Sequence, residues 1–202
     1  MKNRVKICQL ACVLIATISL LSCTQDKGSE EVSRKDAALS VIYNRKSVRD
    51  FIKERPVSKE DIDAILKAAM SAPSGKDTRP WEFLVINDRE TLDKMAAELP
   101  TAKMLANVPM AIVVCGDSVR SSYWYLDCSA ATENILLAAE ALDLGAVWTA
   151  AYPYADRMEI VINATELPAN ILPLVVIPIG YPKGQQTVKD KYDEKKIHYN
   201  KW

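Results

Sequence analysis

The stretch Ala72–Ile86, APSGKDTRPWEFLVI, joins a loop directly to a strand and is the most informative part of the chain. Its proline, serine and glycine residues predict a loop, and the run Trp81–Ile86 predicts a strand. Just upstream, Ser58 with a carboxylate three residues later predicts a capped helix, whose apolar residues from Ile62 to Ala69 follow at helical spacing. The stretch is therefore a helix–loop–strand connection, a place where proteins often carry binding residues.

Outward from this stretch, helices alternate with strands. The longest helical pattern, Tyr123 to Leu144, is rich in alanine and has Gly145 where the residue that closes a helix is expected. The apolar run Leu174–Ile179 predicts a strand, and its Pro178 predicts that one end lies at a sheet edge or bulge. By pattern alone, the alternation favours a parallel α/β sheet. The other expected elements are helices at 37–44, 89–98 and 156–164 and strands at 81–86, 110–115 and 146–149.

Composition excludes several classes of protein. The chain has 202 residues, 49% apolar and 26% charged, which is typical of one globular domain with an appendage. Its net charge of zero provides no broad basic field for a nucleic acid, and a single His argues against a metal site. The glycines form neither a dinucleotide-binding fingerprint nor a P-loop. Cys115 and Cys128 fit buried small apolar residues, with a disulfide between them as the alternative.

The first 22 residues are typical of an export signal. A basic start precedes the apolar run Ile7–Leu21, which is shorter than the roughly 20 residues needed to span a bilayer. The run ends Leu-Leu-Ser-Cys23, which resembles the lipobox of bacterial lipoproteins; a conventional signal with an incidental cysteine is the alternative. We therefore expect a signal peptide at 1–22, a lipidated Cys23 with a polar tether at 23–38, and a folded domain at 39–202. The protein would be exported and lipid-anchored to a bacterial membrane, or cytoplasmic if the signal is not used.

Several segments of the predicted domain could bind a ligand. Arg45–Phe51, RKSVRDF, places guanidinium groups around a serine, a combination that matches phosphate oxygens. The loop Pro73–Phe83 exposes backbone N–H groups beside charges of both signs, and the small residues of Gly145–Pro153 would let a backbone meet a flat ligand. Lys189 and Lys191 in the polar tail could add phosphate contacts. Taken singly, each segment also fits an ordinary role: a solvated turn, a plain connection, core packing or a charged tail.

In this order, these segments resemble the FMN-dependent nitroreductase family from Leu39 to Trp202. The opening RKSVR looks like the family's Arg-x-Ser-x-Arg start, and APSGKDTRPWEFLVI looks like its proline–serine loop followed by a strand. LDLGAVWTAAYP is similar to the helix end and strand that meet the flavin. VIPIGYP, with KDKY and IHYNKW, is similar to the last strand and the basic C-terminal segment.

The resemblance implies an α+β fold with three α-β-α layers around a mixed, mostly antiparallel sheet, in a homodimer with FMN at its interface. The phosphate would be held by residues 45–49 and the tail. The isoalloxazine would be lined by residues 148–150, with a backbone N–H facing N5, and approached by the loop 73–79 of the other subunit. The implied FMN-binding residues are Arg45, Lys46, Ser47, Arg49, Pro73, Ser74, Asp77, Arg79, Trp148, Thr149, Ala150, Lys189 and Lys191.

The implied activity is that of a flavin-dependent oxidoreductase. A hydride or electron pair would pass through flavin N5 from a reduced donor such as NAD(P)H to a nitroaromatic, quinone or similar small-molecule acceptor, in ping-pong order. No catalytic side chain, metal or nucleic acid is expected, because the cofactor carries the chemistry. A non-catalytic flavin-binding lipoprotein, acting as a carrier or surface component, is the alternative, and a module for an apolar ligand is a third possibility. After export, either FMN is acquired outside the cytoplasm or the electrons come from a donor other than NAD(P)H.

The loop departs from the family pattern, Asn-x-Gln before Pro-Trp, at Asp77 and Arg79. An ionised Asp77 accepts from flavin N3–H but cannot donate to O2, and its charge opposes an anionic reduced flavin. Arg79 would act in the opposite direction if it pointed inward. We expect the two charges to cancel in part and to shift the flavin potential from the family norm.

The role of Asp77 is tested by Asp77→Asn. Removal of a negative charge beside the ring should move the flavin midpoint potential to a more positive value, measured by dye-equilibrated reduction of the FMN-loaded protein. Glu60→Gln, on the preceding predicted helix, is the control. An unaltered midpoint potential in Asp77→Asn would contradict this role.

Overall fold

The computed structural model describes residues 33–202, so the predicted signal, Cys23 and most of the predicted tether lie outside the described residues. Residues Ala38–Trp202 make one unit, and this unit holds every segment predicted to bind a ligand. Within the described range, we find no helix with the length and apolar character required to cross a bilayer.

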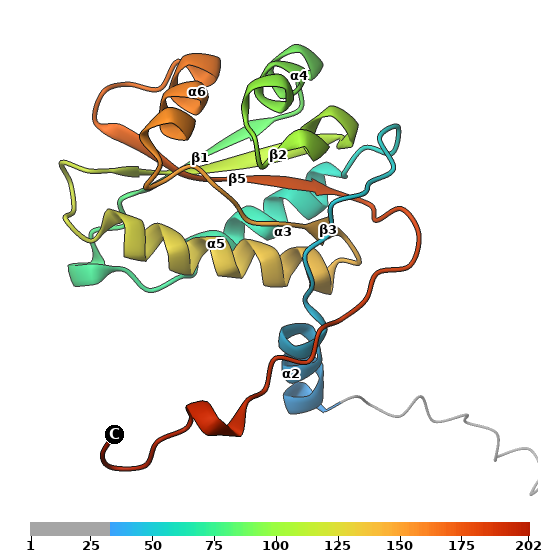
Figure 1. The fold of residues 1–202 in the computed structure, drawn as a ribbon, viewed down its shortest axis with the longest axis vertical. Coiled ribbons are helices and arrows are strands. Elements are labelled where there is room, and N and C mark those ends of the chain that lie inside the picture. The colour runs from blue at the N-terminus through green and yellow to red at the C-terminus, as the bar shows by residue number, and fades with distance from the viewer. Residues whose placement is uncertain (1–32) are drawn as a thin grey trace, which may run out of the picture. The chain divides into compact units, whose positions relative to one another are not determined.

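Helices and strands follow the expected order along the chain (Figure 1). The predicted cap at Ser58 is confirmed, because its Oγ accepts a hydrogen bond from the Asp61 N–H at 3.0 Å. The helices are α2 (Arg34–Asn44), α3 (Lys59–Met70), α4 (Arg89–Glu98), α5 (Trp124–Ala141) and α6 (Ala155–Thr165), with short 3₁₀ turns η1 (Gly75–Asp77), η2 (Lys103–Asn107) and η3 (Glu194–Lys196). The strands are β1 (Trp81–Ile86), β2 (Met110–Asp117), β3 (Gly145–Ala146), β4 (Thr149–Ala150) and β5 (Ile171–Gly180).

The strands form one antiparallel sheet. Its order is β1–β2–β5–β3, with β4 also paired to β5, and each of these pairs is antiparallel. The parallel sheet favoured by the sequence pattern is therefore wrong, and the mostly antiparallel sheet implied by the resemblance is confirmed. The connection between β1 and β2 runs through α4 and η2 and returns to the end of the sheet at which β1 finishes. Ile86 and Ala111 are therefore cross-strand neighbours. A helical connection gives parallel neighbours only when it crosses to the opposite end.

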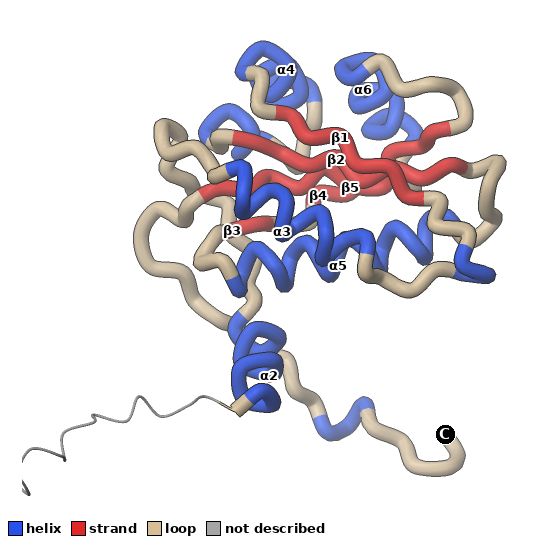
Figure 2. Tube along the Cα trace, turned by 180° about the vertical axis from the view of Figure 1, so that it is seen from behind, coloured by secondary structure: helices blue, strands red, loops and turns tan. Residues whose placement is uncertain are grey.

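Helices cover both faces of the sheet. α3 and α5 lie on one face and α4 and α6 on the other (Figures 1 and 2). Because successive side chains of a strand point to opposite faces, the buried strand β2 contributes to both cores. Its residues Met110, Ile112 and Val114 join the core with α3 and α5, and Ala111, Val113 and Cys115 join the core with α4 and α6.

The long helix α5 ends earlier than predicted, and Gly145 does not close it. Asp143 takes the left-handed conformation after the helix, with φ 56°, and the Leu144 N–H donates to the Ala139 carbonyl at 2.8 Å. Gly145 belongs to β3 instead, where a Cβ would lie 2.7 Å from side-chain atoms of Val48. Close packing, rather than helix termination, requires glycine at this position.

The strand predicted at 146–149 is split into β3 and β4, which both pair with β5. β5 lies inside the sheet, so an edge position for Pro178 is wrong. Pro178 falls between Val176 and Ile179, whose partners are β4 and β3, and the neighbouring chain is interrupted there. This break accommodates a residue without an N–H. The irregularity in the β2–β5 pairing lies at Leu174, which is skipped between the pairs Val114–Val175 and Cys115–Pro173.

Cys115 and Cys128 are buried free thiols, so the disulfide alternative is wrong. The Cys128 thiol donates to the Cys115 carbonyl, with 3.2 Å between Sγ and oxygen. Burial raises the pKa of both thiols to about 12. Neither is therefore available as a thiolate nucleophile at neutral pH.

Candidate functional site

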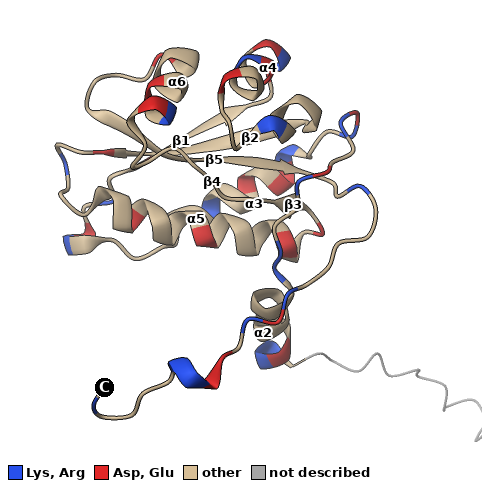
Figure 3. Cartoon of the chain, in the orientation of Figure 1, with Lys and Arg blue, Asp and Glu red and all other residues tan. Residues whose placement is uncertain are grey.

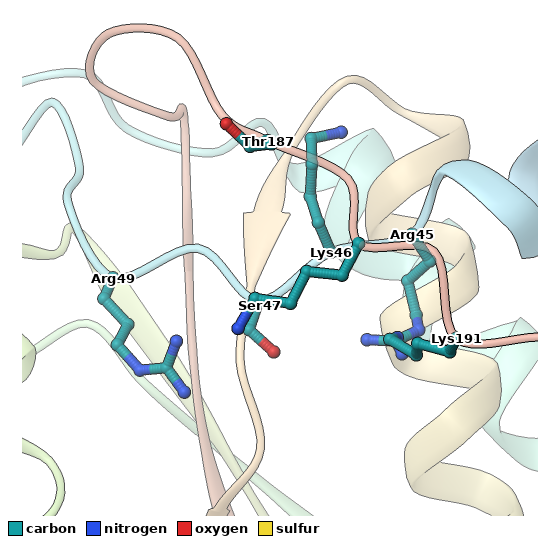
Figure 4. A pocket seen from close by; sticks show the side chains of 7 residues that line it. Arg45, Lys46, Ser47, Arg49, Thr187 and Lys191 are labelled. Atoms are coloured by element: carbon teal, nitrogen blue, oxygen red, sulfur yellow. The ribbon is translucent and has the colours of Figure 1, made fainter.

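A basic pocket forms where the segment after α2 meets the C-terminal tail. It has a volume of about 220 Å³ (Figure 4). Figure 3 shows the basic residues of the two chain segments meeting in this region. The structure thus brings together all the residues that the sequence analysis expected at the phosphate. It adds one residue that was not expected, Thr187. The lining residues are Arg45, Lys46, Ser47, Arg49, Thr187, Lys189 and Lys191.

The backbone of the segment 45–49 is held against β3. Ser47 forms a parallel bridge with Ala146, and the Val48 N–H donates to the Ala146 carbonyl at 3.0 Å. Val48 is buried against Gly145. Because side chains alternate along an extended chain, Ser47 and Arg49 point away from the core when Val48 points into it. Core packing of Val48 therefore orients the pocket.

Two glutamates of α5 neutralise part of the basic charge. The Arg45 Nε lies 3.2 Å from Glu133, and the Lys46 Nζ lies 2.8 Å from Glu140. These two ion pairs also hold the start of the segment 45–49 against the surface of α5. Among the described residues, no carboxylate lies within ion-pair distance of the remaining cations of the pocket. These are Arg49, Lys189 and Lys191.

The pocket fits a phosphate dianion. Guanidinium and ammonium groups donate to phosphate oxygens in charge-assisted hydrogen bonds, and the Ser47 hydroxyl is a further donor. The sequence did not single out Thr187, because the tail was recognised only by its lysines. A hydroxyl two residues before Lys189 was the available signal.

The segment 148–150 runs away from this pocket along β5. It begins two residues after Ala146, the bridge partner of Ser47, so residues 148–150 lie about 7–13 Å along an extended chain from the bridge. Thr149 is buried, and its hydroxyl donates to the Val176 carbonyl. The Thr149 hydroxyl is therefore already engaged within the sheet. The side chain of Trp148 is 37% exposed.

The loop of residues 73–79 lies at the other end of α5. The Gly75 N–H donates to Oδ1 of Asp127, in the first turns of that helix, at 2.9 Å. Asp127 and Glu140 are separated by roughly 20 Å along the helix. Within one chain, the structure does not bring this loop together with the phosphate pocket. Pro73, Ser74, Asp77 and Arg79 all belong to it.

Asp77 and Arg79 form a two-pronged ion pair on the surface. The Arg79 Nε and Nη2 each lie 2.7 Å from a carboxylate oxygen of Asp77. Hydrogen bonding from Arg79 lowers the pKa of the Asp77 carboxyl, so both groups are charged at neutral pH. The loop therefore places these two opposite charges in direct contact.

Asp127 is a functional candidate that the sequence reasoning missed. Its side chain is buried, between the buried Trp124 and Cys128, and it contacts the loop through Gly75. An acidic residue on the apolar stripe of a predicted helix was the signal.

Among the described residues, the side chains show neither a cluster of metal ligands nor an exposed thiol. Within residues 33–202, we find no group of three or more His, Cys, Asp or Glu side chains that could hold a metal ion. The two thiols are buried and protonated. A phosphate pocket beside an extended backbone is instead suited to holding a phosphorylated cofactor that carries the chemistry.

Comparison with known proteins supports a cofactor-dependent enzyme. The chain matches the model of the Nitroreductase family over residues 42–100 and 94–181. A candidate NADH dehydrogenase/NAD(P)H nitroreductase from Methanothermobacter thermautotrophicus is 43% identical over 175 residues, which cover 85% of this chain and 91% of that protein. The fold and this family match define an oxidoreductase of the α+β class.

Solved structures give the same result. A candidate NADH dehydrogenase/NAD(P)H nitroreductase from Bacteroides thetaiotaomicron superposes with a TM-score of 0.81 at 66% identity, covering 82% of this chain and 98% of that one. An FMN-dependent nitroreductase from Clostridium difficile has a TM-score of 0.77 at 31% identity, covering 81% and 99%. The chain belongs to the nitroreductase family. It is an oxidoreductase with FMN as its cofactor, as the sequence resemblance implied.

The phosphate pocket is tested by Arg49→Gln. Loss of a charge-assisted hydrogen bond should weaken FMN binding roughly tenfold or more, while riboflavin, which lacks the phosphate, should bind almost as in the wild type. Quenching of flavin fluorescence measures both affinities. Lys53→Gln, an exposed neighbour outside the pocket, is the control. An equal loss of riboflavin affinity would contradict a phosphate role for Arg49.

Proposed function

We propose that this protein is an NAD(P)H-dependent, FMN-containing reductase of nitroaromatic, quinone or similar small-molecule acceptors. The observation that carries the proposal is the basic pocket of Arg49, Lys189 and Lys191, joined through the Ser47–Ala146 bridge to the segment 148–150. NAD(P)H as the donor is taken from the names of its relatives, which are candidate NADH dehydrogenase/NAD(P)H nitroreductases. When bound, FMN supplies two-electron transfer between donor and acceptor.

In this proposal, the residues of this chain bind the FMN phosphate and orient the flavin ring. Arg49, Lys189 and Lys191 would bind the phosphate, and the Ser47 hydroxyl would donate to it. Glu133 and Glu140 hold Arg45 and Lys46 at the entrance. The backbone of Trp148, Thr149 and Ala150 would orient the ring, and the buried Thr149 hydroxyl fixes that backbone on β5.

The active unit that we propose is a homodimer. The loop of residues 73–79 and the phosphate pocket stand at opposite ends of α5, so one chain would contact a given flavin with its phosphate pocket while its partner contributes the loop. Exposed apolar side chains support such an association: Tyr125 and Leu126 on α5 are 36% and 54% exposed, and Trp202 at the end of the tail is 101% exposed. Tyrosine and tryptophan side chains are enriched at protein–protein interfaces.

Turnover tests the activity. FMN-loaded protein mixed anaerobically with NADH or NADPH should lose its flavin absorbance near 450 nm, roughly the position of oxidised flavin. A nitroaromatic or quinone acceptor should then restore it, with parallel lines in double-reciprocal plots as ping-pong kinetics require. The outcome that favours a non-catalytic flavin-binding protein is retained FMN with no turnover of any donor and acceptor.

We also propose that the protein is exported and lipid-anchored through Cys23. The proposal rests on the basic start, the short apolar run and the sequence Leu-Leu-Ser-Cys23. With the polar residues that follow Cys23 as the tether, the domain would stand off a membrane surface. Cytoplasmic location without processing is the competing possibility.

Cys23→Ser should abolish the anchor. In bacteria expressing the full chain, the wild-type protein should incorporate labelled palmitate and sediment with membranes, whereas the variant should do neither. Cys12→Ser, inside the apolar run, is the matched control and should behave as the wild type. Equal labelling of Cys23→Ser and the wild type would contradict lipidation at Cys23.

A further inference from the structure

Asp127 is a buried carboxylate at the base of the loop of residues 73–79. It is 6% exposed and lies on the apolar side of α5, between Trp124 and Cys128, which are also buried. Carboxylates are almost never buried unless they are paired. Its Oδ1 accepts the Gly75 N–H at 2.9 Å, and its Oδ2 has no hydrogen-bond partner among the described residues. Burial of a carboxylate with one unpartnered oxygen costs folding free energy. A role for Asp127 that offsets this cost is therefore expected.

The loop that Asp127 contacts has a strained backbone. Lys76, Asp77 and Arg79 have φ values of 55°, 56° and 47°, in the left-handed region that residues other than glycine rarely adopt. Such strain persists only where surrounding contacts enforce it, and it is concentrated at functional sites.

Most of the contacts that enforce this conformation lie within the loop. The Arg79 N–H donates to Ser74 Oγ at 3.1 Å, the Thr78 hydroxyl donates to the Gly75 carbonyl at 3.0 Å, and Arg79 pairs with Asp77. The bond from Gly75 to Asp127 differs because it joins the first turn of the loop to a helix 52 residues away. It sets the position of the loop relative to the core, and not merely its internal shape.

We propose that Asp127 is a positioning residue for the flavin site. Its carboxylate fixes Gly75, and through it Ser74 and Asp77, at the distance and angle at which they meet the isoalloxazine, without itself contacting the flavin. A carboxylate suits this role because it accepts a stronger hydrogen bond from a backbone N–H than a neutral group does. The inference rests on the proposed function, in which this loop faces the ring.

The first test compares Asp127→Ala, Asp127→Asn and the wild type in binding FMN and riboflavin. Asp127→Ala should weaken the binding of both flavins by the same factor, about tenfold, as expected for the loss of one charge-assisted hydrogen bond at the ring end. Asp127→Asn keeps an acceptor oxygen and should restore both affinities to within about threefold of the wild type. Ser129→Ala, on the same helix with its hydroxyl bonded to the Tyr125 carbonyl, is the matched control.

The second test removes the donor instead of the acceptor and covers the case in which Asp127→Ala does not fold. Gly75 is the first residue of η1 and follows an extended Ser74, a position that a proline backbone fits. Gly75→Pro deletes the N–H, whereas Gly75→Ala keeps it, and both add a Cβ beside Tyr123, where the nearest atom is at 3.1 Å. Only Gly75→Pro should lose about tenfold in affinity for both flavins.

Each outcome decides the matter. Size-exclusion elution and the thermal midpoint of the flavin-free protein are measured for every variant. They distinguish a variant whose loop of residues 73–79 is displaced from one that no longer folds or dimerises. If folded Asp127→Ala binds both flavins like the wild type, if Asp127→Asn fails as Asp127→Ala does, or if Gly75→Pro equals Gly75→Ala, the positioning role is wrong. If the wild-type protein itself binds neither flavin, it is the proposed function that fails.

Discussion

Burial of β5 inside the sheet is the constraint on which the rest of the structure depends. One edge of β5 is paired along its length with β2, and both strands contribute apolar side chains to the cores. The other edge holds β3 and β4, which carry Ala146, Thr149 and Ala150. The chain that leaves β5 becomes the tail with Lys189 and Lys191. Both segments that line the phosphate pocket are therefore connected to this one buried strand, the first through β3 and the second along the chain.

Helix α5 determines which parts of the flavin site one chain can supply. Glu133 and Glu140 fix Arg45 and Lys46 toward its C-terminal end, while Asp127 holds the loop of residues 73–79 near its N-terminal end. A rigid helix between these anchors keeps the phosphate pocket and the loop apart. This separation gives a physical reason for the proposed dimer, in which two chains meet at each flavin.

Among the described residues, carboxylates neutralise some of the cations in the site and leave others unpaired. The glutamates of α5 neutralise two of the cations in the pocket, and Asp77 neutralises Arg79 in the loop. The cations without a carboxylate partner in the described chain lie where a phosphate would bind. A net positive pocket in a chain of zero net charge shows that local placement, and not composition, determines what the surface attracts.

Much of this protein could be predicted from local sequence. The cap at Ser58, the apolar β2 and the basic segment RKSVR follow from hydrogen-bonding capacity, alternation and charge, and the resemblance of four ordered segments indicated the family. Strand direction could not be predicted from alternation, because a helical connection that returns to the same end of the sheet has the same pattern as one that crosses it. The use of Gly145 beside Val48, the position of Pro178 opposite an interrupted neighbour and the contact of Asp127 with Gly75 join residues far apart in the chain. The sequence by itself thus determined the elements and the chemistry of the binding residues, whereas the tertiary structure decided which of those residues meet, because that depends on packing between distant segments.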